Sequence, residues 1–139
     1  MNKEPKQIIV IRKDLNMRKG KQISQGSHAS LKVFLDLCEK GETYDARNGN
    51  LKKYTFYFES DSAWSKWLEG RFTKIVVSCD NEQELDLLYQ KALDKNLPCS
   101  MIIDAGLTEF KGTPTKTCIA IGPAYPDEID DITKHLKLL

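Results

Sequence analysis

Four short apolar runs along the chain predict the strands of a buried sheet. They cover residues 7–12 (QIIVIR), 74–79 (KIVVSC), 99–103 (CSMII) and 117–121 (TCIAI). In each run the apolar residues are continuous rather than alternating with polar ones, which is typical of strands covered on both faces. The pattern therefore predicts a sheet of about four strands with helices on both sides.

Helical spacing of apolar residues fills most of the sequence between these runs. We expect helices over 20–39, 60–69 and 81–96, and a last helix that begins at Pro126. Asp80 precedes the third of them as a possible capping residue. Strand, helix and strand then follow within about 30 residues, which predicts two parallel strands with a right-handed crossover. The predicted fold class is α/β, as a single three-layer α/β/α domain over residues 1–139 with a mixed sheet.

Residues 43–58 fit neither pattern. Asn48-Gly49 is a turn signal of β-hairpins. Tyr54, Phe56 and Phe58 then alternate with Thr55 and Tyr57, as strand residues do. We expect a small hairpin or an extended flap here.

Composition is that of an ordinary globular domain. The chain has 139 residues, of which 40% are hydrophobic and 29% charged, enough for one domain with a real core. No apolar run approaches the ~18 residues of a membrane span, and the first residues lack the apolar segment of a signal peptide. We therefore expect a cytoplasmic protein with no membrane contact.

The cysteines favour a structural role. Cys38, Cys79, Cys99 and Cys118 are far apart, form no C-x-x-C pair, and are accompanied by only two histidines. A zinc site is therefore not expected. Most of these cysteines lie in apolar runs, which predicts reduced, buried thiols.

Positive charge is concentrated near the start of the chain. Residues 1–22 contain seven cations and two anions, although the whole chain has a net charge of only +1. This distribution favours a local phosphate-binding surface over general polyanion binding. A chance arrangement of surface lysines is the alternative.

The start of the first predicted helix carries the first set of candidate residues. Arg18, Lys19 and Lys21 precede or open the helix, and Lys21, Gln25 and His28 recur at i, i+4 and i+7, which places them on one face. Exposed amides at a helix start, together with cations, can bind an anion. The alternative is a solvated basic turn that leads into an amphipathic helix.

The second set follows the third apolar run. Asp104 comes directly after that strand, at an edge where open α/β sheets bind ligands. Thr108, Thr113, Thr115 and Thr117 then supply hydroxyl groups. A carboxylate with several hydroxyls can hold and polarise a water molecule. The alternative is a turn in which these side chains bond only to backbone amides.

Taken together, these segments resemble the type 2 peptidyl-tRNA hydrolases. The resemblance rests on four ordered blocks: Arg12-x-Asp14-Leu15-x-Met17-x-x-Gly20-Lys21, Gln25-x-x-His28-Ala29, Asp104-Ala105-Gly106-x-Thr108 and Thr117-x-x-Ala120-Ile121-Gly122-Pro123. It covers nearly the whole chain apart from the first few residues and 43–58.

The resemblance implies an enzyme that hydrolyses the ester between a peptide, or an N-blocked amino acid, and the 3′ end of tRNA. Such an enzyme recycles tRNA from aborted translation, needs no metal or organic cofactor, and is often a homodimer. The family's implicated positions correspond to Lys21, Gln25, His28, Asp104, Thr108 and Thr117.

We assign expected roles on that basis. The catalytic group would be Lys21, His28, Asp104, Thr108 and Thr117, and the substrate-binding group Arg18, Lys19, Gln25 and Thr115. Asp104 would orient or deprotonate the attacking water, directly or through Thr108. Lys21 would pair with Asp104 and offer its charge to the oxyanion or the terminal phosphate. His28 would form a hydrogen bond within the site.

Three departures from the family pattern leave alternatives open. The loop after Thr108 is one residue longer than expected, so Thr115 competes with Thr117 for one role. Glu109 stands where Gln is commoner, and the longer 43–58 segment could stack its aromatics on the CCA end or pack them onto the core. Alternative functions are a non-catalytic tRNA- or RNA-binding module, a protein-interaction module that uses the flap, and a hydrolase of another blocked ester such as D-aminoacyl-tRNA.

Overall fold

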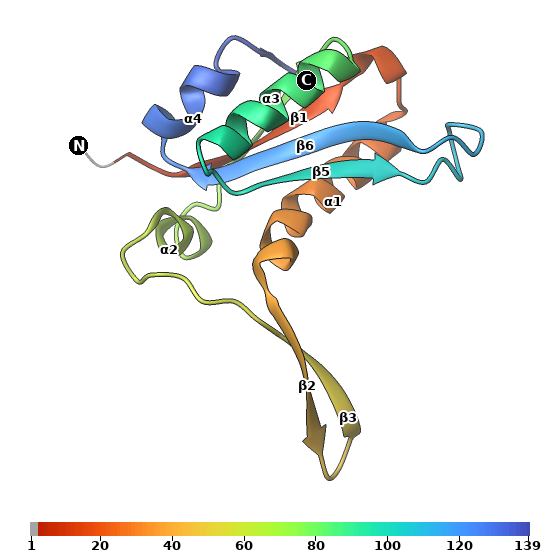
Figure 1. The fold of residues 1–139 in the computed structure, drawn as a ribbon. Helices are drawn as coiled ribbons and strands as arrows, with labels where there is room; N and C mark the ends of the chain where they lie inside the picture. Colours follow the sequence, from red (N-terminus) through yellow and green to blue (C-terminus); the bar gives the residue numbers. More distant parts are fainter. Residues whose placement is uncertain (1–2) are drawn as a thin grey trace.

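The computed structural model describes residues 3–139 and is built on one mixed sheet (Figure 1). Its strand order is β5-β6-β1-β4-β7. The strands are β1 (Lys6–Arg12), β4 (Lys74–Cys79), β5 (Cys99–Asp104), β6 (Thr115–Ala124) and the short β7 (Lys137–Leu138). β1 and β4 are parallel, whereas β6 runs antiparallel to both of its neighbours, β1 and β5.

Helices cover both faces of this sheet (Figure 1). They are α1 (Lys19–Leu37), α2 (Ala63–Leu68), α3 (Glu82–Asp94) and α4 (Pro126–Thr133), with a 3-10 turn at Lys13–Leu15. α1 packs on one face, over β5, β6 and β1, and α3 and α4 pack together on the other. The α/β fold class expected from the sequence is confirmed.

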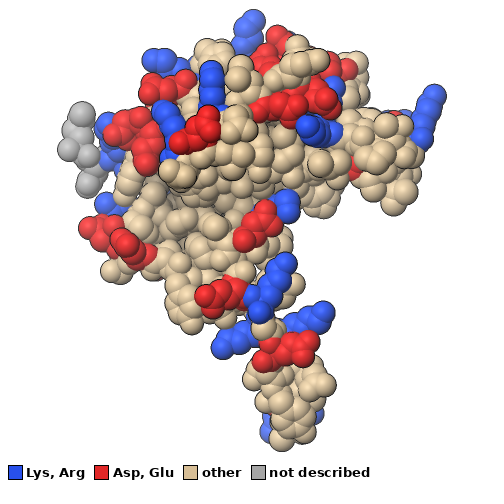
Figure 2. Space-filling model, viewed as in Figure 1, with Lys and Arg blue, Asp and Glu red and all other residues tan. Residues whose placement is uncertain are grey.

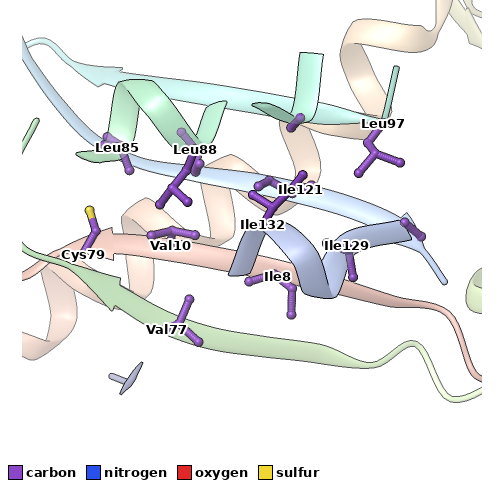
Figure 3. Close-up of a cluster of buried hydrophobic side chains, with 13 residues drawn as sticks. Ile8, Val10, Val77, Cys79, Leu85, Leu88, Leu97, Ile121, Ile129 and Ile132 are labelled. Atoms are coloured by element: carbon purple, nitrogen blue, oxygen red, sulfur yellow. The ribbon is translucent and has the colours of Figure 1, made fainter. Parts of the chain in front are cut away.

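Two hydrophobic clusters form the core because both faces of β1 are buried. Ile8 and Val10 point to the α3–α4 side, where they join Leu85, Ile129 and others (Figure 3). Alternate residues of the same strand point to the α1 side and pack with Ala29 and Val33. A strand buried on both faces explains the continuous apolar run in its sequence.

Gln7 is one of the polar side chains buried in this core. It lies in β1 and is fully buried. Its amide nitrogen donates a hydrogen bond to the Gly122 carbonyl over 3.2 Å, and its amide oxygen accepts one from the Ser30 hydroxyl. Gln7 thus ties β1 both to the end of β6 and to α1, and its polar atoms are satisfied.

The structure corrects several details of the sequence interpretation. β4 and β5 are parallel, as expected, but β6 and β1 lie between them in the sheet. The capping residue of α3 is Asn81, not Asp80, because the Asn81 side chain accepts the Glu84 N–H over 2.8 Å. The first helix ends at Leu37 rather than near residue 39, because the next strand begins at once.

A two-stranded hairpin projects from the end of α1 (Figure 1). It consists of β2 (Glu39–Asp45) and β3 (Gly49–Thr55), which pair only with each other within the described chain. The turn falls at the Asn48-Gly49 signal, with Gly49 at φ +79°. The hairpin begins earlier than the 43–58 segment expected from the sequence.

All four cysteines are free. Cys79 and Cys118 are buried in the sheet, and burial raises the pKa of Cys79 to about 11 and that of Cys118 to about 12. Cys38 and Cys99 are only partly buried. The expected structural role fits the two buried thiols best, because a protonated thiol is a poor nucleophile.

Across residues 3–139, no helix combines the length and apolar character that a membrane span would need.

Candidate active site

The first candidate residues are placed by α1. Its core face consists of Gln25, Gly26, Ala29 and Val33, all buried. The small residues on this face let the helix lie close to the sheet, and the Cβ of an alanine at Gly26 would sit 3.6 Å from Ile9. Close packing holds the helix against β5 and β6. It thereby fixes the position of the first helical turn, which carries Lys21, relative to the edge of the sheet.

The second set is placed by the end of β5. Asp104 is the last residue of that strand. The Lys21 Nζ donates a hydrogen bond to Oδ1 of Asp104 over 2.8 Å, and each side chain is 13% exposed. The ion pair expected from the sequence is therefore present, at the carboxyl end of a strand.

Asp104 accepts hydrogen bonds from three donors. Lys21 and the Gln25 amide reach Oδ1, at 2.8 and 3.3 Å, and the Gly106 N–H reaches Oδ2 at 2.8 Å. The Lys21 hydrogen bond is the largest cause, and Gly106 and Gln25 add to it, so the pKa of Asp104 lies below its usual range despite partial desolvation. The carboxylate is thus held ionised and fixed in orientation.

Lys21 also contacts the loop that follows β5. Its Nζ donates to the Thr108 hydroxyl oxygen over 2.8 Å and lies 5.7 Å from the centroid of the Phe110 ring. Phe110 is itself packed against the core cluster under α1. The ammonium group is therefore held between a carboxylate, a hydroxyl and an aromatic face.

Buried hydrogen bonds from β6 hold Gln25, which in turn contacts Asp104. The Thr117 hydroxyl donates to the amide oxygen of Gln25, and the Cys118 thiol donates to the Gln25 carbonyl over 3.2 Å. Thr117 and Gln25 are almost completely buried. Since its oxygen accepts from Thr117, the Gln25 amide is oriented with its nitrogen toward Asp104.

Other candidates lie outside this cluster. His28 is exposed and approaches only Ser24, with 3.4 Å between its Nε2 and the serine Oγ. Thr115 begins β6 and is the register partner of Asp104, but its hydroxyl donates to the Thr113 carbonyl in the preceding loop. Arg18 and Lys19 are exposed at the start of α1 and, within residues 3–139, form no ion pair. The structure thus joins the side chains of Lys21, Gln25, Asp104, Thr108 and Thr117, places the partly exposed Thr115 beside Asp104 in the sheet, and leaves Arg18, Lys19 and His28 exposed.

Two contributors were missed by the sequence analysis. The Gly106 N–H anchors the second oxygen of Asp104, and Phe110 flanks Lys21. Gly106 has φ +83°, and the Cβ of any other residue would lie 2.5 Å from the Thr113 carbonyl oxygen. Phe110 is the one aromatic residue of the loop 105–114, and this was the available signal for it.

A separate apolar groove lies on the other side of α1. It has a volume of about 790 Å³, and its lining includes Ile23, Leu31, Phe72 and Leu139. Ile23 and Lys21 are two residues apart, so they point in nearly opposite directions around the helix. The groove is therefore not part of the Lys21–Asp104 cluster. Within residues 3–139 no group of three His, Cys, Asp or Glu side chains could hold a metal ion.

Comparison with known proteins gives the family. The family model described as "Peptidyl-tRNA hydrolase PTH2" matches residues 5–139. The chain is 40% identical to the peptidyl-tRNA hydrolase of Methanocaldococcus jannaschii, over 96% of this chain and 99% of that protein. It is also 40% identical to the one from Sulfurisphaera tokodaii, over 96% and 98% of the two chains. The chain belongs to the PTH2 family of peptidyl-tRNA hydrolases.

A solved structure supports the fold alone. A protein of unknown function from Agrobacterium tumefaciens matches with a TM-score of 0.55 and 14% sequence identity, over 98% of each chain. At that identity the likeness concerns the arrangement of strands and helices, not the site.

Proposed function

We propose that this protein hydrolyses the ester between a peptide, or an N-blocked amino acid, and the 3′ end of tRNA, and so releases tRNA for reuse. Family membership over residues 5–139 supports this, as do relatives named peptidyl-tRNA hydrolase that match over almost their whole length. The observation that carries the mechanism is the Lys21–Asp104 pair at the end of β5.

The remaining hydrogen-bonding capacity of the site suits ester hydrolysis. An ionised carboxylate has about four acceptor positions, and three of those on Asp104 are taken by Lys21, Gln25 and Gly106. One position remains on Oδ2, where a water molecule can donate a hydrogen bond. The low pKa of Asp104 favours orienting that water over strong general-base catalysis.

Lys21 is suited to stabilise the negative charge that develops. Its ammonium group has three N–H donors, of which Asp104 and Thr108 take two. The third can be donated to the oxyanion that forms when the water oxygen bonds to the ester carbonyl carbon. The Thr108 oxygen accepts from Lys21, which leaves its own O–H free to donate in the site.

The reaction is completed when the bond from the carbonyl carbon to the ribose oxygen breaks. The proton lost by the water ends on that ribose oxygen, so the products are a free carboxylic acid and tRNA. Thr117 acts through Gln25 in this scheme, as a positioning residue. His28 and Thr115 would contact the substrate from the surface beside the cluster.

Arg18 and Lys19 are proposed to bind backbone phosphate next to the ester. Both are exposed at the start of α1, where free backbone amides also favour an anion. Phosphate contacts position a nucleic acid without reading its sequence, as an enzyme acting on many tRNAs requires.

We also propose a cytoplasmic homodimer. Translation-related chemistry supports the location. The apolar groove beside α1 supports self-association, since Ile23 is 64% exposed and Leu31 57% exposed. Sedimentation of the wild-type chain and of a Leu31→Asp variant tests this: a dimer that the variant dissociates is expected, and a wild-type monomer would overturn it.

The activity is tested by release of tRNA from N-acetyl-aminoacyl-tRNA, with and without EDTA. We expect turnover that EDTA does not affect and that Asp104→Asn lowers by roughly 10²–10³-fold. Asp86→Asn is the matched control, because it removes a carboxylate from another lysine pair, with Lys116 at 3.1 Å. Binding of tRNA without any turnover by the wild-type chain would overturn the proposal in favour of an RNA-binding module.

A further inference from the structure

The β2–β3 hairpin stands away from the domain and has no neighbour of its own. Its two strands form a separate sheet, and within residues 3–139 neither outer edge pairs with another strand. An isolated two-stranded hairpin is marginally stable in water. Because the hairpin projects from the domain, both of its faces are available for contact with another molecule.

An aromatic cluster fixes the root of this hairpin to the domain. The Phe56 ring lies 4.9 Å from both Phe34 in α1 and Trp64 in α2, measured between ring centroids. Phe58 lies 5.4 Å from Phe56. The aromatics expected to belong to a flap are therefore divided: Phe56 anchors the root, Phe58 packs on Phe56 while remaining partly exposed, and Tyr44, Tyr54 and Tyr57 are exposed.

The strand register defines the composition of each hairpin face. Lys40 pairs with Tyr54, Glu42 with Lys52, and Tyr44 with Asn50. Paired residues point to the same side, so these six residues form one surface, which we name the tyrosine face. The Lys40 Nζ lies 5.8 Å from the centroid of the Tyr54 ring, in agreement with this assignment.

The cations of the hairpin form no ion pair among the described residues, although Glu42 is the register partner of Lys52. Within residues 3–139, Lys40, Arg47, Lys52 and Lys53 take part in no ion pair, whereas Lys6, Arg12, Lys21 and Lys116 on the domain do. Figure 2 shows basic side chains standing out along the hairpin. Glu42 is the one acidic residue of the tyrosine face, because Asp45 pairs with Gly49 on the opposite face, where it accepts the N–H groups of residues 47 and 48.

This composition favours RNA over a protein partner. The tyrosine face carries two lysines, two tyrosines, one amide and one glutamate, and it has no aliphatic side chain. The cores of protein interfaces are depleted of Lys and Glu, and lysines along an open edge discourage pairing with another strand. Lysines beside exposed aromatic rings suit a polyanion with stacked bases.

The hairpin also lies at a distance that a large substrate can span. From Lys21 to Leu37, α1 extends about 24 Å at 1.5 Å per residue. Each hairpin strand adds about 20 Å at about 3.3 Å per residue. The hairpin continues from the end of α1 that is opposite the Lys21–Asp104 cluster (Figure 1). A small ester could not reach both places, but the body of a tRNA could.

We propose that the tyrosine face is a second tRNA-binding surface, which holds the tRNA at a part remote from its 3′ end. Lys40 and Lys52 contact phosphates, and Tyr44 and Tyr54 lie against riboses or bases. This inference rests on the proposed hydrolysis of peptidyl-tRNA. It assigns the hairpin to substrate affinity and not to the chemical step.

The test compares a hairpin variant, Lys40→Gln with Lys52→Gln, with a matched control, Lys91→Gln with Lys134→Gln. The control removes the same charge from two exposed lysines on the α3–α4 side. Two ester substrates are used: N-acetyl-aminoacyl-tRNA, and the same acyl group on a CCA trinucleotide. For the hairpin variant we expect KM for the tRNA ester to rise about tenfold with kcat unchanged, and KM for the trinucleotide ester to stay constant.

Binding of uncharged tRNA gives a readout that does not depend on catalysis. Loss of two phosphate contacts should make the slope of log Kd against log salt concentration shallower by about two in the hairpin variant. Tyr44→Ala with Tyr54→Ala should weaken binding while leaving that slope nearly unchanged. The control should match the wild-type chain in both respects.

Two results would overturn the inference. One is an unchanged tRNA KM and salt slope in the hairpin variant. The other is an altered sedimentation coefficient of that variant with unchanged tRNA binding, which would assign the hairpin to contact between copies of the chain. If the wild-type chain hydrolyses neither ester, the proposed function fails, whereas the salt slopes still decide whether the tyrosine face binds tRNA.

Discussion

Lys21 and Asp104 are 83 positions apart in the chain, and their side chains meet at 2.8 Å. Each is 13% exposed, so bulk solvent screens the pair less than it would screen a surface ion pair. Each group also sets the position of the other, because neither has a second opposite charge within the salt-bridge distance among the described residues. Their contributions to catalysis should therefore be coupled.

We expect Lys21→Met and Asp104→Asn each to lower kcat/KM by roughly 10²–10³-fold, the usual effect of removing a group that stabilises developing charge. The double variant should be no slower than the slower single variant, since the two act as one unit. Initial rates on N-acetyl-aminoacyl-tRNA measure this. Losses that multiply in the double variant would contradict the coupling.

The ion pair also predicts a pH dependence of stability. The folded pKa of Asp104 is lowered, chiefly by the Lys21 hydrogen bond, relative to an unfolded value of about 3.9. The ionised carboxylate therefore adds stability above the unfolded value and loses it as the pH falls through the folded pKa. Urea unfolding of wild type and Asp104→Asn should show a constant difference above about pH 5 that shrinks below about pH 4. A difference that persists unchanged at pH 2 would be inconsistent with this pair.

Thr117 and Thr115 should differ in stability. Thr117→Val leaves the oxygen of the buried Gln25 amide without its donor, which should cost about 1–3 kcal/mol of unfolding free energy. Thr115→Val removes only a hydrogen bond to the Thr113 carbonyl at the partly exposed start of β6 and should change the free energy of unfolding by less than about 0.5 kcal/mol. Urea midpoints at neutral pH compare them. Equal effects would mean that the buried chain of hydrogen bonds is not what orients Gln25.

The loop after β5 offers a paired glycine test. Gly106 and Gly112 both have positive φ, +83° and +80°, so alanine at either should cost about 1–2 kcal/mol. Only at Gly106 does the new Cβ meet backbone, 2.5 Å from the Thr113 oxygen. We expect Gly106→Ala to lose most turnover because the amide that anchors Asp104 moves, and Gly112→Ala to keep it. Similar activity in the two variants would argue against that anchor.

His28 should affect binding more than chemistry. It is exposed and contacts Ser24 rather than Asp104. We expect His28→Ala to raise KM for the tRNA ester by several-fold while kcat changes little. A fall in kcat as large as that of Asp104→Asn would place His28 at the reacting atoms instead.

The fold could be predicted where burial leaves a pattern in the sequence. β1, β4 and β5 were located closely because strands buried on both faces are continuously apolar. The bounds of the hairpin were not, because β2 (Glu39–Asp45) is almost entirely exposed and has no apolar alternation to mark it. A strand without a buried face has no hydrophobic pattern in the sequence, so only the Asn48-Gly49 turn signal was available. That signal located the turn correctly.

The site could be predicted in part for similar reasons. Lys21, Gln25 and His28 share a helix face, but His28 is about 10 Å further along the axis than Lys21, so it cannot reach the same carboxylate. The helical period shows which side of the helix a residue lies on, but it does not show how far along the helix axis that residue is from the ligand-binding end. The Gly106 amide was missed because a backbone donor has no side-chain signature, and its role depends on a turn that only the folded loop defines.

The buried Gln7 has a consequence for how the sheet is assembled. A shift of β1 by one residue would exchange Ile8 and Val10 for their neighbours on the other face, and both faces would still be apolar. Hydrophobicity alone therefore does not distinguish the two alignments. Gln7 does, because the shifted strand would bury its amide away from Gly122 and Ser30. The one buried polar residue of the strand thus selects the alignment that its apolar neighbours leave open.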